Sequence, residues 1–325
     1  MKYTEPNMTY VGDHFDDIYY NLLNDLLGKP QYVCSPRGSK IHENLVATLV
    51  LNNPRARILS TKQRDANYGF AVGEFLWYWK GNRDLNTMVY YNKRMKNFSD
   101  DGHTLNSAYG YRLRTKKFFC GEGQFGLGHS QWEITKRTLT QDPDSRRAVM
   151  IINSPEDQTA AAIYESKDVP CTLSLQFFIR DNKLDLHVNM RSNDVVWGLT
   201  YDLFSFTLLQ ECMLLELKKE EKLKSLELGK YYHTAGSIHV YEQHFKMCNQ
   251  IRLEYLESKY EEVPAMKPFG DIEQLNRLSV VESNIRDGKM YMGDTEGFEE
   301  PTAWMLMQLI NHRTKRDKEE SKNAG

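Results

Sequence analysis

The chain has 325 residues, 40% of them hydrophobic, which is enough apolar material for one large domain or two small ones. Its 42 basic and 44 acidic side chains nearly cancel, so no overall positive charge favours binding to nucleic acid. The five cysteines form no CxxC pair, and there is neither a signal-peptide core nor an apolar run of about 18 residues, so we expect a cytoplasmic protein without disulfides, structural zinc or a membrane span.

Three elements are predicted in the first part of the chain. Asp13–Leu27 has apolar residues at helical spacing, and the Gly28 and Pro30 that follow favour the end of a helix. Ile41–Leu51 is rich in Val and Leu and is predicted as a strand. Tyr68–Trp79 is predicted as a mostly buried helix.

The middle of the chain combines helices with a β-hairpin. Ser130–Leu139 is predicted as a helix, and Arg147–Ile152 as a strand. Cys171–Ile179 and Lys183–Ser192 have the pattern of two strands joined by a short turn, which predicts a hairpin. Leu203–Leu217 is largely apolar and is predicted as a helix.

Three further segments lie in the last third of the chain. The charged run Lys218–Lys222 is expected to form a solvated helix face. Gly236–Tyr241 is expected to be a strand or the end of one. The charged residues Lys315–Gly325 are expected to fray.

Cys171 and Arg191 together indicate a nucleophilic site. A lone cysteine is most often a buried small hydrophobic residue. A hairpin that puts both residues at neighbouring strand ends would let the guanidinium of Arg191 lower the pKa of the thiol, and the thiolate is the reactive form. We therefore take Cys171 as a candidate nucleophile, although spacing alone leaves the geometry open.

Several arginines have the setting of a phosphate site. Arg37 lies in a Ser-Pro-Arg-Gly-Ser turn, Arg146 and Arg147 follow an Asp-Pro-Asp turn, and Arg191 precedes Ser192. Guanidinium groups suit bidentate phosphate binding, and surface ion pairing is the alternative.

Three further side chains are candidates. Glu74 lies within an apolar helical run, where a carboxylate is uncommon unless it is paired or functional. His239 and Tyr241 alternate on a predicted strand and so face the same side, where they could hydrogen-bond a sugar hydroxyl. For His239 a satisfied core histidine is the alternative, and the residues alone favour it.

Together these residues resemble the thymidylate synthase family, from about Asp13 to about Phe245 and in the family's order and spacing. The resemblance rests on Gly73–Trp77, Tyr109–Gly110, Asp144–Arg147, Pro170–Cys171, Gln176, Arg191–Asp194, Gly198 and His239–Tyr241. It implies an α/β fold (α+β, three-layer) in which helices cover a large twisted mixed sheet, and a homodimer formed through the sheet face. Residues 1–250 would form the catalytic domain, and residues 251–325 a mostly helical extension of the same domain without an assigned role.

The resemblance also implies roles for single residues. Cys171 would add to C6 of a pyrimidine nucleotide, so that C5 attacks the methylene of 5,10-methylenetetrahydrofolate without help from a metal. Glu74, Tyr109 and Asp202 would complete the catalytic set. The nucleotide would contact Arg37, Gln176, Arg191, Ser192, Asp202, His239 and Tyr241, with Arg146 and Arg147 of the partner subunit. The folate would contact Asp194, Gly198, Trp77 and Tyr91.

Two departures from the family pattern concern the base. Asp202 stands where thymidylate synthases carry an asparagine, and Thr172 stands where a histidine usually follows the thiol. A carboxyl group accepts from the amine of cytosine and, with one shared proton, also pairs N3, whereas O4 of uracil would face a lone pair. Both residues resemble the phage deoxycytidylate 5-hydroxymethylase branch, in which water quenches the exocyclic methylene, so we expect dCMP as substrate and 5-hydroxymethyl-dCMP as product.

Other outcomes remain open at this point. A CMP 5-hydroxymethylase, a dCMP 5-methylase, a thymidylate synthase and a noncatalytic nucleotide binder are the alternatives. Ser192 beside Arg191 resembles the deoxynucleotide enzymes. Val89–Asn92 replaces the tryptophan-lined folate wall of the family, and the apolar segment Trp304–Ile310 precedes a charged tail where the family has its closing C-terminus.

Overall fold

A mixed β-sheet forms the centre of the protein in the computed structural model, which describes residues 8–118, 128–257, 261–289 and 296–324. In this part of the chain eight strands follow the order β1-β3-β10-β8-β7-β6, with β2 beside β3 and β9 beside β10. The strands are β1 (Thr9–Gly12), β2 (Tyr32–Cys34), β3 (Ile41–Leu51), β6 (Val149–Ile151), β7 (Thr172–Arg180), β8 (Lys183–Met190), β9 (Asn193–Asp194) and β10 (Glu227–Tyr241), with a separate pair β4 (Lys117–Phe118) and β5 (His129–Ser130). The longest strand, β10, pairs antiparallel with β3 and parallel with β8.

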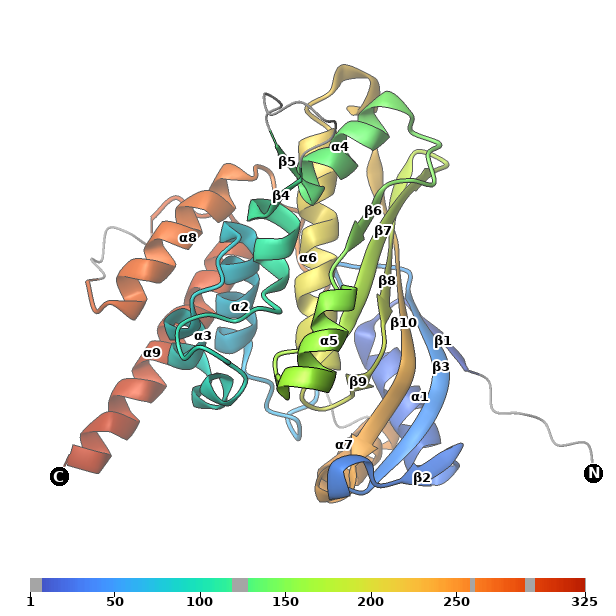
Figure 1. The fold of residues 1–325 in the computed structure, drawn as a ribbon, viewed down its shortest axis with the longest axis vertical. Helices are drawn as coiled ribbons and strands as arrows, with labels where there is room; N and C mark the ends of the chain where they lie inside the picture. The colour runs from blue at the N-terminus through green and yellow to red at the C-terminus, as the bar shows by residue number, and fades with distance from the viewer. Residues whose placement is uncertain (1–7, 119–127, 258–260, 290–295, 325) are drawn as a thin grey trace, which may run out of the picture.

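Helices are stacked in layers on one face of this sheet (Figure 1). They are α1 (Phe15–Gly28), α2 (Tyr68–Lys80), α3 (Leu85–Tyr91), α4 (Gln131–Gln141), α5 (Pro155–Tyr164), α6 (Leu199–Leu217), α7 (Phe245–Leu256), α8 (Glu273–Arg286) and α9 (Glu300–Ala324). Helix α6 packs on β8 and β10, α2 packs on α6, and α9 packs on α2 beside α8. Helix α1 packs on β3 and α7.

The alternation of apolar and polar residues along the strands decides which face of the sheet the helices cover. In β8, Leu184, Leu186 and Val188 are buried toward the helices, whereas Asp185 and His187 are only partly covered on the other face. Helix α6 lies between the sheet and α2, so it is buried on nearly every side and lacks a polar stripe.

The C-terminal helices are attached to α2 and α3 through a buried carboxylate. Glu282 of α8 is 2% exposed and accepts a hydrogen bond of 2.9 Å from the hydroxyl of Tyr91. It also pairs with Lys80 at 3.2 Å and Arg286 at 3.0 Å. A carboxylate in this position is stabilised by two cations and one hydroxyl, so the burial of its charge is compensated.

Close contact between helices is possible because α2 carries two glycines. A Cβ on Gly69 would lie 2.5 Å from the Cβ of His312 in α9, and a Cβ on Gly73 would lie 2.4 Å from the ring of Tyr91. Any larger residue at either position would push the neighbouring element away.

The expected α/β arrangement is confirmed, and so are the helices around Asp13–Leu27 and Tyr68–Trp79, the strand Ile41–Leu51 and the hairpin. Other expectations were wrong. Helix α6 ends at Leu217, Lys218–Glu220 form an exposed turn, and Glu221–Leu223 form a short 3-10 helix.

Two further segments differ from the expectation. Residues up to Ala324 continue α9, where Arg313 and Arg316 pair with the carboxylates one turn later. The strand expected at Gly236–Tyr241 begins at Glu227. In the described ranges, no helix has the length and apolar character needed to cross a membrane.

Candidate active site

Cys171 and Arg191 lie at neighbouring strand ends, as the hairpin predicts. Cys171 directly precedes β7, and Arg191 directly follows β8. The amide of Arg191 donates to the carbonyl of Cys171 at 2.9 Å, and Nη2 of its guanidinium lies 3.6 Å from the Sγ of Cys171. The guanidinium also donates from Nε to the carbonyl of Pro170 at 3.0 Å, which fixes its direction.

The pKa of the Cys171 thiol is nevertheless raised. Burial is the main cause, and it outweighs the charges of Arg191 and Arg37, which lower the pKa, while Asp202 raises it further. The expectation that Arg191 produces a net depression of this pKa was therefore wrong for the protein without ligand. The thiol is therefore protonated in the protein without ligand, and the guanidinium is positioned to stabilise the thiolate when it forms.

Asp202 and Tyr109 lie near the thiol, and Glu74 lies near Asp202. Burial, with the charge of Asp202, raises the pKa of Glu74 on α2 to about 8. Burial likewise raises the pKa of Asp202 on α6 to about 7, although a hydrogen bond from Asn193 lowers it. The hydroxyl of Tyr109 accepts from the amides of Cys171 at 3.2 Å and Thr172 at 3.4 Å. Groups with pKa values near neutrality are suited to proton transfer at that pH.

Asp194 is a further polar residue of the site and lies in the turn before α6. Its Oδ1 accepts from the amides of Val196, at 2.8 Å, and Trp197, whereas its Oδ2 is buried and has no partner among the described residues. Burial raises the pKa of this carboxyl to about 6. An unpartnered buried acceptor of this kind is suited to a donor on a ligand.

The sugar candidates His239 and Tyr241 lie at the end of β10. The rings of His239 and Tyr241 are 5.3 Å apart, which confirms that they share one side of β10. Burial lowers the pKa of His239, and the charge of Arg37 lowers it further, so the imidazole is neutral near pH 7. Arg37 therefore lies close enough to act on both His239 and the Cys171 thiol. Ser192 is partly buried next to Arg191.

A cavity of about 780 Å³ opens between α2, α3 and α9. Its lining includes Asn67, Tyr90, Tyr91 and His312. The ring of Tyr91 packs on Gly73, the residue before Glu74 on α2.

Of the predicted folate residues, Gly198 lies in the cluster of site residues and Trp77 does not. Trp77 is 3% exposed, and its indole donates to Asp84 instead of facing a cavity, so the structure does not bring it to the site. Gly198 caps α6 between Asp194 and Asp202 and is part of the cluster.

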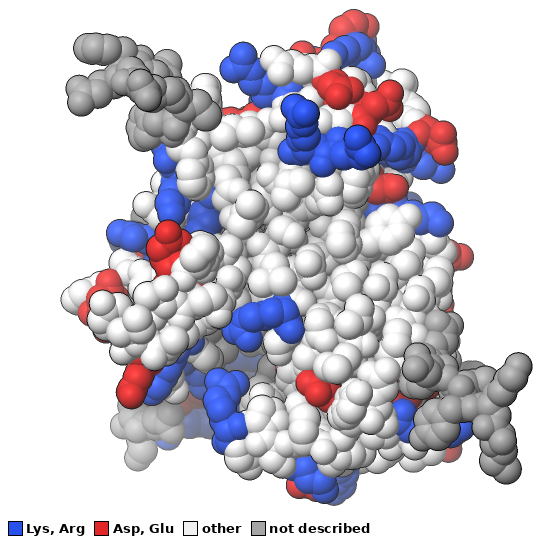
Figure 2. Space-filling model, turned by 45° about the vertical axis from the view of Figure 1, so that its right-hand side comes forward, with Lys and Arg blue, Asp and Glu red and all other residues white. Residues whose placement is uncertain are grey.

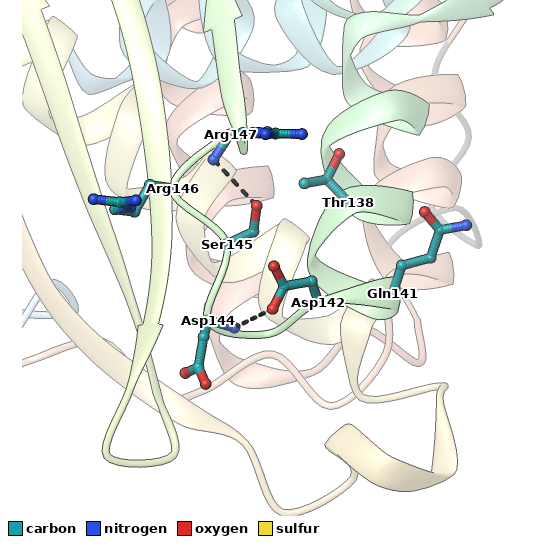
Figure 3. Close-up of a pocket in the computed structure, with 7 residues that line it drawn as sticks. All are labelled: Thr138, Gln141, Asp142, Asp144, Ser145, Arg146 and Arg147. Atoms are coloured by element: carbon teal, nitrogen blue, oxygen red, sulfur yellow. Dashed lines mark hydrogen bonds between the residues drawn. The ribbon is translucent and has the colours of Figure 1, made fainter.

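Arg146 and Arg147 line another cavity, of about 820 Å³, at the start of β6. Figure 3 shows their side chains leaving the turn in opposite directions. Both are exposed and have no ion-pair partner within the described ranges. Gln176 donates to the carbonyl of Arg146 at 2.9 Å. No contact among the described residues joins these three side chains to Cys171.

Two residues of the cluster were not predicted from the sequence. Tyr78 hydrogen-bonds Glu74, and its position four residues later on the same helix was a usable signal. Asn193 donates to the Oδ2 of Asp202 at 2.6 Å. No sequence pattern indicates that contact, because it depends on how β9 meets α6.

Comparison with known proteins gives one consistent result. A family model described as thymidylate synthase matches residues 18–289. Deoxyuridylate hydroxymethyltransferase of Bacillus phage SP01 is 31% identical over 94% of this chain and 81% of that protein. Deoxycytidylate 5-hydroxymethyltransferase of Enterobacteria phage T4 is 31% identical over 45% of this chain and 55% of that protein. The solved structure of thermostable thymidylate synthase A from Bacillus subtilis matches with a TM-score of 0.60 and 21% identity, over 78% of this chain and 87% of that one, which shows the shared fold.

Replacing Glu74 with glutamine is expected to change how stability depends on pH. The carboxyl ionises near its ordinary 4.5 when unfolded but keeps its proton to about 8 when folded, so the native state loses stability as pH rises between these values. Glu74→Gln removes this loss and should raise the unfolding free energy by roughly 4 kcal/mol at pH 8, with the gain vanishing near pH 4.5. Urea unfolding across this range measures it. The exposed Glu221→Gln is the control, and curves that stay parallel for Glu74→Gln and the wild type would contradict the prediction.

Proposed function

The chain belongs to the thymidylate synthase family, and on this premise we propose that it converts dCMP to 5-hydroxymethyl-dCMP with 5,10-methylenetetrahydrofolate as co-substrate. The family's transfer of a one-carbon unit from a folate to a pyrimidine nucleotide is its general chemistry; the base and the product are the proposal. The observation that carries it is Asp202, a carboxyl in the same buried cluster as the Cys171 thiol. Such a group pairs the amine and N3 of cytosine.

Cys171 starts the reaction by adding to C6. Its Sγ forms a bond with C6, and the electron pair of the C5–C6 double bond moves toward C5 and the ring. Arg191, at 3.6 Å, stabilises the thiolate that must form first. Neutral Asp202 holds a proton against N3, which lets the ring accept the negative charge that develops on addition.

Glu74 is proposed to act as the general acid and base that transfers protons at C5 of the pyrimidine. Its pKa of about 8 keeps it protonated near neutrality, and Tyr78 supplies a hydrogen bond when it ionises. When bound, 5,10-methylenetetrahydrofolate supplies a one-carbon unit at the oxidation level of formaldehyde. C5 would bond to this carbon, the bond between the carbon and the folate nitrogen would break, and the proton on C5 would be lost. Water would then add to the exocyclic carbon, the C6–Sγ bond would break, and the C5–C6 double bond would be restored. Overall, dCMP, methylenetetrahydrofolate and water give 5-hydroxymethyl-dCMP and tetrahydrofolate.

The residues present fit a folate. The buried, unpartnered Oδ2 of Asp194 is placed to accept from a pterin N–H group, and Tyr91 lines the adjoining cavity. Gly198 lies against the backbone of Asp194 and the Oδ2 of Asp202, where it carries no side chain to fill the space. We therefore propose that Asp194, Gly198 and Tyr91 hold the co-substrate. Trp77 is left out, because its indole N–H is already bonded to Asp84.

The C-terminal extension is proposed to belong to the same domain as the catalytic residues. Residues 251–325 supply α8 and α9, which pack on α2, the helix that carries Glu74. His312 of α9 lines the proposed folate cavity. The extension would then support the general acid and form one wall of the co-substrate site.

A homodimer through the open face of the sheet is the proposed assembly. This face, on the right of Figure 1, comes forward in Figure 2, where a wide area carries few charged side chains. Thr48 and His187 each lie within hydrogen-bonding distance of Thr234 in its centre, and Val46 is 67% exposed. An uncharged face is suited to a partner, and exposed Arg146 and Arg147 are free to reach that partner's phosphate site.

The dUMP 5-hydroxymethylase is the second candidate. The similarity to the deoxyuridylate hydroxymethyltransferase of Bacillus phage SP01 extends over 94% of this chain and favours it. The two candidates differ in the groups that the same edge of the pyrimidine presents to Asp202: N3 and an amine at C4 in dCMP, N3–H and a carbonyl at C4 in dUMP.

Incubation with dCMP, dUMP or CMP tests the proposal directly. Each nucleotide is supplied with tetrahydrofolate and formaldehyde, and products are identified by mass spectrometry. We expect dCMP to gain a hydroxymethyl group, and Cys171→Ser to abolish the gain. Addition of a methyl group, or turnover of dUMP alone, would refute the proposal. Tritium release from C5 separates an enzyme from a nucleotide-binding protein, which releases none.

Asp202→Asn should shift preference toward dUMP. An amide whose oxygen faces N3–H and whose NH2 group faces O4 matches uracil and mismatches cytosine. This orientation places the NH2 group beside Asn193, whose unpartnered Oδ1 can turn to accept from it. We expect the ratio of kcat/KM for dCMP over dUMP to fall by about a hundredfold. Thr200→Val, which removes a different buried hydroxyl from α6, is the control. An unchanged ratio in Asp202→Asn would show that Asp202 does not read the base.

Mixed dimers test the shared site. Arg146→Ala and Cys171→Ser subunits are each expected to be inactive or weak as homodimers. When mixed, one site combines an intact thiol with an intact arginine, so activity should return to about a quarter of the wild-type value if subunits exchange at random. Activity assays after mixing measure the rescue, and its absence would argue against arginines donated across the interface.

A further inference from the structure

Asn193 is a buried amide with both of its hydrogens committed. It is 3% exposed and lies in the short strand β9, aligned with Ile238 of β10. Its Nδ2 donates to the Oδ2 of Asp202 at 2.6 Å and contacts the Sδ of Met190 at 3.3 Å. Its Oδ1 has no partner among the described residues. In this orientation the Nδ2 group meets two acceptors, an oxygen and a sulfur, whereas the reversed amide would set its oxygen against the Sδ of Met190.

The approach of these two side chains depends on Gly198. A Cβ there would lie 3.1 Å from the Nδ2 of Asn193 and 3.2 Å from the Oδ2 of Asp202. The contact is therefore enclosed by Gly198 at the start of α6 and by Met190 at the end of β8. A short hydrogen bond in such a setting holds the plane of the carboxyl group.

A neutral carboxyl group alone does not distinguish cytosine from uracil. Cytosine presents an acceptor at N3 and a donor at N4, and uracil presents a donor at N3 and an acceptor at O4. A carboxyl with one proton offers one donor and one acceptor, and moving the proton to the other oxygen reverses their order. Asp202 could therefore pair either base unless something fixes which oxygen carries the proton.

We propose that Asn193 is a positioning residue that makes Asp202 selective for cytosine, by holding Oδ2 as an acceptor and leaving the proton on Oδ1. An oxygen that already accepts a short hydrogen bond is the less favourable place for the proton. Oδ1–H then donates to N3, and Oδ2 accepts from the N4 amine. Uracil in the same position would place N3–H against O–H and O4 against a lone pair.

Two substitutions at position 193 test this, and both rest on the proposed dCMP activity. Asn193→Leu removes the donor at similar size and should lower the dCMP-over-dUMP ratio of kcat/KM by at least about tenfold, because either proton position becomes allowed. Asn193→Asp replaces the donor with a carboxylate that accepts the proton of Oδ2 and leaves Oδ1 as an acceptor, so dCMP loses its contact at N3 while dUMP gains one there. Weaker binding of dCMP together with stronger binding of dUMP is an outcome that loss of packing does not produce.

Binding gives a readout separate from turnover. In the Cys171→Ser background, titration calorimetry with dCMP and dUMP should show the same change in relative affinity. Thr200→Val is the matched control, since it removes a buried hydroxyl from the first turn of the same helix, and it should leave the ratio unchanged. If Asn193→Leu fails to fold, Asn193→Asp alone carries the test.

The outcomes separate this inference from the proposed function. A folded Asn193 variant that keeps the wild-type ratio in both assays overturns the inference and leaves the dCMP activity standing. A wild-type protein that prefers dUMP refutes the proposed substrate. In that case a ratio that still depends on Asn193 supports its ordering role, with Oδ2 facing N3, and a ratio independent of it overturns that role too.

Discussion

Desolvation is the constraint on which the candidate site depends. Cys171, Glu74 and Asp202 are brought together where burial penalises each charged form, and the pKa of each is raised for that reason. A thiol alone in such a place would be inert. The guanidinium of Arg191 offsets part of this penalty for the thiolate only, so the site favours one ionisation over the others. Protons kept on the two acids are then available at the steps that need them.

Short-range sequence patterns predicted the elements whose formation depends mainly on neighbouring residues. The strand Ile41–Leu51 and the hairpin follow from alternation and turn residues, and they brought Cys171 to Arg191 as expected. The first part of β10 was missed because Gly229 and Gly236 interrupt its pattern. The extension was expected to be mostly helical, but the end of α9 was expected to fray, because that part is held by ion pairs one turn apart and not by an apolar stripe.

Burial was harder to predict than position. The net pKa of Cys171 depends on how much of the site is removed from water, and this is a property of the assembled layers. The indole of Trp77 could not be assigned for the same reason, since the segment that presents it is buried on every side. Asn193 belongs to the Arg191–Asp194 motif, but its hydrogen bond to Asp202 forms only where β9 meets α6. Residue types were thus easier to predict than the environments that decide their chemistry.

The two glycines of α2 have a dynamic consequence. Glycine within a helix lowers its intrinsic stability by about 1 kcal/mol relative to alanine, so α2 depends on its neighbours to remain helical around Glu74. Those neighbours are Tyr91 and His312, which fill the space that the glycines leave. Local opening of α9 and loosening of the general acid would then be coupled, and hydrogen exchange at the α2 amides would report both events as one unit.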